Sequence, residues 1–158
     1  MDHLDHAAQI LDRLRAMLEA ELVQARGQRL LIRALDIEGL FERARQRGAF
    51  NAQLAQLERA LGESLEAAGH ALDLAQVTLA DLRKAAPEAS QRLDACMADV
   101  RALASSLREI DAVNLTLGGR ALSRVRGYLA ALAPQTVAYD RRGASRPMDD
   151  ISTACRVA

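Results

Sequence analysis

The sequence is poor in the residues that build mixed folds and most catalytic sites. Of its 158 residues only 3% are aromatic, Trp is absent, and there are 3 Pro, 3 His and 2 Cys. It has no net charge, with 21 basic and 21 acidic residues. Because nucleic-acid binders usually show a basic excess or stripe, we expect no nucleic-acid partner. No apolar run approaches the roughly 20 residues of a membrane span, so we expect no integral membrane segment.

The cysteines are also too few for a disulfide framework. Cys96 and Cys155 are far apart, and two free thiols fit a reducing compartment. The first residues, including Asp2 and Asp5, lack the basic and apolar regions of a signal peptide. We therefore expect a soluble, cytoplasmic protein.

Half of the residues are apolar. Most of these are Ala and Leu, and together with many Arg, Glu and Gln they favour long helices over sheets. The expected fold is all-α: an antiparallel bundle of three long helices, with a short extra helix near Pro87 and a flexible C-terminal tail. We place the helical bundle in residues 1–133 and the tail in residues 134–158, where no helical or strand period survives.

The first helix is predicted from Asp2 to about Arg26, with Gly27 as its end or a bend. Its apolar stripe comprises Leu4, Leu11, Leu14, Leu18, Leu22 and Ala25. The second helix is predicted from about Gln28 to Ala68, followed by a break over residues 69–77. Apolar residues in it recur at steps of three and four, the pattern of antiparallel bundles and coiled coils.

A short helix is predicted from Thr78, as its cap, to about Ala85. Pro87 suits the first turn of the third long helix, since its missing N–H needs no partner there. That helix is predicted to run to about residue 133, before Pro134. Asn114 lies on its seam, where an apolar residue is expected. A seam Asn costs stability and sets register or orientation, and we favour this role over bonding to a partner's backbone.

No constellation of residues indicates catalysis, a metal or a cofactor. His3 and His6 are spaced to share a metal, but such a site needs further converging ligands. We interpret them as part of a solvated first turn. Carboxylates such as Glu19, Glu21 and Asp111 mostly alternate with Arg, which is typical of solvated helix faces. We expect no enzyme, no metal and no cofactor.

Gly118 and Gly119 are adjacent inside the third helix, without the preceding strand of a phosphate-binding loop. Two interpretations stay open: close approach of another helix, or a hinge or groove for a partner. We interpret Cys96, beside the core stripe, as a small buried hydrophobe. Tyr128 continues the apolar stripe, which favours packing. Tyr139 lies in the tail beside charged residues, as binding anchors often do.

The third helix and the tail resemble the FlgN family of flagellar export chaperones. The stretch from Arg108 to Gly118 is similar to the sequence around that family's characteristic Asn, here Asn114. The tail has Tyr139 followed four residues later by Gly143, which resembles the family's tail motif. Asp140 departs from that motif, where Gly is common.

This resemblance implies a cytoplasmic chaperone for hook-associated subunits, those of the hook–filament junction. It would prevent their premature assembly and deliver them to the export gate and the export ATPase apparatus. It also implies that Tyr139 and Gly143 dock at the gate, and that the end of the third helix holds the client. The apolar surplus that we expect there to form the client groove comprises Leu122, Val125, Tyr128, Leu129 and Leu132.

Two other classes of protein are alternatives to a chaperone. A structural coiled-coil or adaptor protein would form a stable oligomer without a secreted client, whereas a chaperone of this kind is expected to be a monomer or a weak homodimer. An enzyme built on a helical bundle would need inward-facing Glu-x-x-His pairs, and the sequence has none.

Overall fold

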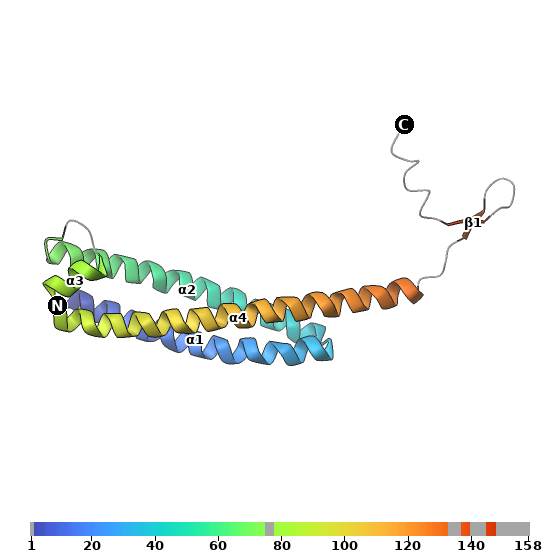
Figure 1. Ribbon diagram of the computed structural model, residues 1–158, viewed down its shortest axis with the longest axis horizontal. Helices are drawn as coiled ribbons and strands as arrows, with labels where there is room; N and C mark the ends of the chain where they lie inside the picture. The colour runs from blue at the N-terminus through green and yellow to red at the C-terminus, as the bar shows by residue number, and fades with distance from the viewer. Residues whose placement is uncertain (1, 75–77, 133–136, 140–144, 148–158) are drawn as a thin grey trace, which may run out of the picture. The chain divides into compact units, whose positions relative to one another are not determined.

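The computed structural model describes residues 2–74, 78–132, 137–139 and 145–147. Four helices and two short strands follow one another along the chain: α1 (Asp2–Ala34), α2 (Ile37–Ala71), α3 (Leu79–Ala85), α4 (Pro87–Leu132), β1 (Val137–Tyr139) and β2 (Ser145–Pro147) (Figure 1). The chain divides into two compact units, Met1–Ala121 and Leu122–Ala158. The predicted division at residue 133 stays a prediction.

The first unit is the predicted bundle of long helices. α1 and α2 pack against each other as an antiparallel hairpin. The first part of α4 lies beside them (Figure 1), and it runs parallel to α1, since Asp12 pairs with Arg92 and Ala25 with Asn114. The all-α, up-and-down arrangement expected from the apolar periods is confirmed.

The turn between α1 and α2 lies later in the chain than the sequence suggested. The prediction of an end or bend at Gly27 was wrong, because α1 continues to Ala34 and keeps its apolar stripe. The helix ends instead at Leu35, which has a φ of 53°. The N–H of Leu35 bonds to the carbonyl of Ile32 at 3.3 Å and that of Asp36 to the carbonyl of Leu31 at 3.0 Å. This is the Schellman pattern, here without its usual glycine.

Asp36 then starts α2 as its N-cap. Its carboxylate accepts a hydrogen bond of 2.9 Å from the N–H of Gly39. A Cβ at Gly39 would lie 2.5 Å from Asp36 Oδ2 and 2.9 Å from Leu31 Cδ2. A side chain at this position would therefore make the Asp36 or Leu31 side chain shift. The sequence prediction missed this cap because it placed residue 36 inside a continuous helix.

Helices α3 and α4 begin where the sequence predicted. Thr78 caps α3, its hydroxyl oxygen accepting from the N–H of Asp81 at 3.2 Å. Pro87 opens α4, and its ring needs no intrahelical N–H partner there. The short extra helix near Pro87 is confirmed.

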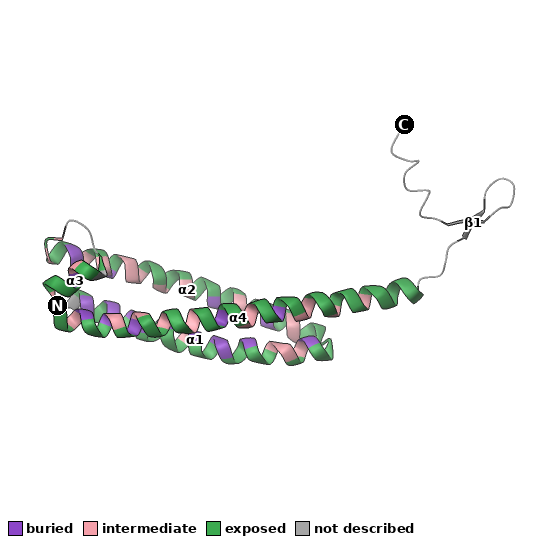
Figure 2. Cartoon of the chain, viewed as in Figure 1, coloured by how far each residue is buried: buried purple, intermediate pink, exposed green. Residues whose placement is uncertain are grey.

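The core of the first unit follows α1 along its length. One cluster of buried residues joins the start of α1 to α2, α3 and α4 through Leu11, Ala68, Leu82 and Leu93. A second cluster, farther along α1, comprises Leu18, Leu22, Ala25, Phe50 and Leu107. Figure 2 shows the buried residues gathered on the facing sides of the helices. All six residues of the predicted α1 stripe are buried.

The tail contains one regular feature that the sequence analysis did not anticipate. β1 and β2 pair as antiparallel strands, with Ala138 opposite Arg146 and Tyr139 opposite Ser145. Each strand has three residues. A run that short contains too few alternations for a strand period to be recognised in the sequence.

Candidate functional site: the end of helix α4

The end of α4 carries large apolar residues that are not covered. Leu122, Tyr128, Leu129 and Leu132 are between 50% and 79% exposed, and Val125 is half-buried. In the described part of α4, no residue after Asn114 is buried. Figure 2 shows this change along the helix, from buried and intermediate colours to exposed ones.

Leu122, Val125, Leu129 and Leu132 are separated by steps of three, four and three residues. In an α-helix these steps place the four side chains on one face. We call these four residues the α4 apolar face. It spans three turns, about 15 Å at 1.5 Å per residue. It has the length and the chemistry to receive an amphipathic helix.

Tyr128 lies beside this face. Its interpretation as internal packing was wrong, because the residue is 65% exposed. The sequence pattern continues through Tyr128 without a change of period, so it could not show where coverage of the helix stops. An exposed Tyr at the edge of an apolar face offers a large contact area and a hydroxyl for a partner.

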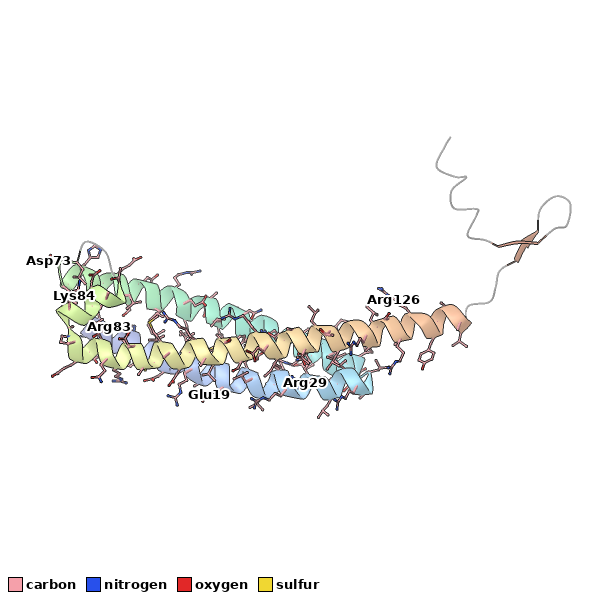
Figure 3. All side chains as sticks on the ribbon, viewed as in Figure 1. Glu19, Arg29, Asp73, Arg83, Lys84 and Arg126 are labelled. Atoms are coloured by element: carbon pink, nitrogen blue, oxygen red, sulfur yellow. The ribbon has the colours of Figure 1, made fainter. Side chains whose placement is uncertain are left out.

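Asn114 lies among the buried residues of α4, with only 4% of its surface exposed. Its Nδ2 donates a hydrogen bond of 2.7 Å to the main-chain carbonyl of Ala25 on α1. Its Oδ1 accepts from Arg29 Nε at 3.3 Å; Figure 3 labels this arginine on α1. The amide thus contacts α1 with both of its polar atoms. Its role in setting register stays a prediction.

A partly buried charge network joins side chains of α1, α2 and α4, and its α4 member, Asp111, lies three residues before Asn114. Glu21 and Arg43 are each 5% exposed and form an ion pair. Arg47 bonds to Glu21 Oε1 at 2.6 Å through Nη1, and to Asp111 Oδ2 at 2.6 Å through Nη2. Its guanidinium also lies 5.3 Å from the centre of the Phe50 ring. The network therefore joins α1, α2 and α4.

This network was not predicted from the sequence. The interpretation of Glu21 as a solvated carboxylate was wrong, because Glu21 is only 5% exposed. Glu21 is three residues after Leu18 and next to Leu22, so helical spacing alone places it at the edge of the buried stripe. Two positive and two negative side chains balance one another, which offsets the cost of removing Glu21 from water.

Of the two interpretations of Gly118 and Gly119, the structure excludes close approach of another described helix. A Cβ built on either glycine meets nothing within 4 Å. Close approach of another helix therefore does not explain them in the described part of the chain. The alternative of a hinge or a partner groove stays a prediction.

Cys96 is buried, as predicted from its place beside the stripe. Its thiol lies 3.5 Å from Asp12 Oδ1. Burial, and then the negative charge of Asp12, raise the pKa of the Cys96 thiol above its usual value. A raised pKa lowers the thiolate fraction, so this cysteine is a poor nucleophile. Cys155 lies outside the described residues.

Of the two predicted docking residues of the tail, the structure describes one, Tyr139. Tyr139 is the last residue of β1, and its backbone pairs opposite Ser145. Gly143 lies outside the described residues. Their proposed role in docking stays a prediction.

Two further properties bear on the class of protein. Within the described ranges, no group of three or more His, Cys, Asp or Glu residues could hold a metal ion. None of the described helices combines the length and the apolar character needed to cross a membrane.

The chain was compared with known proteins in three ways. No curated protein and no solved structure matches it. The family model described as FlgN protein matches residues 1–147, from the first helix through the second strand. The match covers most of the chain, including α4 and both strands of the tail. The chain therefore belongs to the FlgN family, a family of flagellar export chaperones that bind flagellar substrate proteins.

Proposed function

We propose that this protein is a cytoplasmic chaperone for hook-associated flagellar subunits. It holds each subunit before export, prevents premature assembly, and delivers it to the export gate and export ATPase apparatus. The proposal is supported by the family match over residues 1–147 and by one structural observation: α4 ends in an uncovered apolar face.

The α4 apolar face, with Tyr128 beside it, is the proposed client site. Burying one Leu side chain contributes roughly 1.5–3 kcal/mol, so several residues together support a useful affinity. A client helix that covers this face also loses its own apolar surface to the complex. The client segment is then unavailable for contacts with other subunits, which is the physical basis of preventing early assembly.

Tyr139 and Gly143 are the proposed contacts with the export gate. Tyr139 offers an aromatic ring with a polar hydroxyl, a residue type enriched in binding anchors. Separating the client site on α4 from the gate site in the tail lets one chain hold both partners. This function needs no catalytic step and no cofactor, and it suits a monomer or a weak homodimer.

The main test is co-purification of the tagged chain from a flagellated host, with mass spectrometry of the bound proteins. Recovery of a hook-associated subunit with the unaltered chain is expected. The Tyr139→Ala variant is expected to keep the client and lose the export-gate components. Recovery of the chain alone, as a stable oligomer, would favour a structural coiled-coil protein instead.

A second experiment tests the client site. The double variant Leu122→Asp with Leu129→Asp is expected to weaken client binding by more than 100-fold, since it removes two leucines that the client helix would cover. The helical circular dichroism should be unchanged because both residues are exposed. If the folded variant still binds the client, the client site is not on this face.

A further inference from the structure

We propose that the helix bound by the α4 apolar face carries acidic side chains along the edges of its apolar stripe. This inference rests on the proposed function and names the chemistry of the partner. It is carried by two features of α4: the spacing of the apolar face and the charge of the sequence around it.

The spacing of the apolar face determines the kind of element that fits it. Leu122, Val125, Leu129 and Leu132 occupy alternating a and d positions of a heptad. A face with this repeat is matched by another helix with the same repeat, whose side chains pack between those of α4. An extended peptide would instead need unpaired backbone groups, which a continuous α-helix does not offer.

The charge around this face is positive only. From Ala112 to Tyr139 the sequence contains three Arg and no Asp or Glu, although the whole chain is balanced at 21 of each sign. Arg126 follows Val125 and lies at one edge of the face, where Figure 3 shows it on the exposed end of α4. Arg124 is also exposed.

Neither arginine has a partner of opposite charge among the described residues. Some exposed arginines of the bundle do, for example Arg15 with Glu19 and Arg83 with Asp94, whereas others, such as Arg13 and Arg101, do not. Positions at the edges of a helical seam select the partner through their charge. Arg126 occupies the e position at the edge of the face, and Arg124 the c position farther round the helix. The unpaired positive charge at this end of α4 therefore favours a partner with carboxylates opposite Arg126.

The same charge disfavours other possible occupants. In an antiparallel pairing, where e positions face e positions, a second copy of this face would bring Arg126 against Arg126, which is repulsive. Residues 140–158 of the same chain contain four Arg and three Asp, so they also carry a net positive charge. An acid-flanked helix of another protein is the occupant that charge complementarity selects.

The test uses two synthetic helical peptides with Leu at every a and d position. One has Glu at the flanking positions and the other has Gln. Binding to the full chain is measured by fluorescence anisotropy at low and high salt. The test variant is Arg124→Gln with Arg126→Gln. The matched control is Arg13→Gln with Arg101→Gln, which removes the same charge from exposed residues of the first unit that form no ion pair in the described structure.

The unaltered chain is expected to bind the Glu peptide more tightly than the Gln peptide. High salt should weaken the Glu peptide because exposed charges are screened. The test variant should lose about 2- to 5-fold in affinity for the Glu peptide, as the loss of one exposed ion pair at Arg126 would predict, and nothing for the Gln peptide. The control should behave as the unaltered chain. Equal affinity for both peptides, or no effect of the test variant, would overturn the inference.

Two parallel measurements separate this inference from the proposed function. Sedimentation of the unaltered chain and of the variant Leu122→Ala with Leu129→Ala tests whether a second copy occupies the face. If the unaltered chain is a dimer and the leucine variant is not, the inference is overturned. The same arginine and leucine variants are tested against a purified hook-associated subunit. A subunit that needs the leucines but not the arginines overturns the inference and leaves the chaperone function standing. Glu-peptide binding that needs the arginines, without any subunit binding, supports the inference and counts against that client.

Discussion

Asn114 on α4 donates a hydrogen bond of 2.7 Å from Nδ2 to the main-chain carbonyl oxygen of Ala25 on α1. Ala25 belongs to the second core cluster and is fully buried. Asn114 is also the last buried residue of α4 in the described structure. The bond therefore lies at the point where α4 stops being covered and its exposed part begins.

Replacing Asn114 with Ala should lower the free energy of unfolding by about 1–3 kcal/mol. The variant loses two hydrogen bonds, so the Ala25 carbonyl and the Arg29 guanidinium lose their partner on α4. Urea denaturation measures the change. Thr116→Ala is the control, since Thr116 is exposed and bonds only within α4, and it should change stability by less than about 0.5 kcal/mol. Equal effects of the two variants would argue against an orienting role for Asn114.

Glu21→Gln should be among the most destabilising polar substitutions in the first unit. It leaves the buried Arg43 and the half-buried Arg47 without their shared carboxylate. Removing one partner of a buried ion pair costs about 3–5 kcal/mol. Thermal and urea unfolding test this. Glu19→Gln, two residues earlier and paired only at the surface, should cost less than about 1 kcal/mol. A loss of similar size in both variants would mean that the Glu21 network stabilises the fold no more than a surface ion pair does.

Leu35→Gly should stabilise the protein by about 1 kcal/mol. Leu35 has a φ of 53°, a conformation that costs an L-residue with a side chain more than it costs glycine. Leu30→Gly provides the control, because Leu30 is also exposed but lies inside α1, and should destabilise by about 1 kcal/mol. Chemical denaturation is therefore expected to show a gain in stability at Leu35 and a loss at Leu30. A loss of stability at both positions would contradict the Schellman end of α1.

Gly118→Ala with Gly119→Ala should make this part of α4 more resistant to local opening by about 2 kcal/mol in total. A Cβ on either residue has free space around it, so no clash offsets the gain in helix propensity. Amide hydrogen exchange over residues 115–122 measures the effect. If these glycines serve as a hinge or a partner groove, the same variant binds the client more weakly although its helix is more stable. Unchanged client affinity would remove that role.

The stability of the folded chain should decline above about pH 9, in part through Cys96. The folded state raises the pKa of this thiol through burial and the charge of Asp12. Its contribution is complete below the unfolded-state pKa and is lost as the pH rises through the folded-state pKa. Comparing unfolding between about pH 7 and 10 in Cys155→Ser and in Cys155→Ser with Cys96→Ala isolates this contribution. Identical pH profiles would assign the decline to other groups.

Much of this protein could be predicted from the sequence because its helices are long and regularly patterned. The α1 stripe from Leu4 to Ala25, the cap at Thr78 and the start of α4 at Pro87 depend on neighbours within a few residues along the chain. Local spacing and propensity are sufficient to indicate such features. The family resemblance carried by Asn114, Tyr139 and Gly143 was likewise confirmed by the family match.

Tertiary structure alone decided the features that depend on which helices lie beside one another. The end of α1 lies at Leu35 and not at the predicted Gly27, since a glycine inside a packed helix is tolerated when the apolar stripe continues around it. Glu21 proved buried because Arg43 and Arg47, more than twenty residues away, supply its counter-charges. Tyr128 proved exposed although its spacing matches the seam. Spacing tells which residues share a face of a helix, but only the neighbouring helices determine how far along that face is covered.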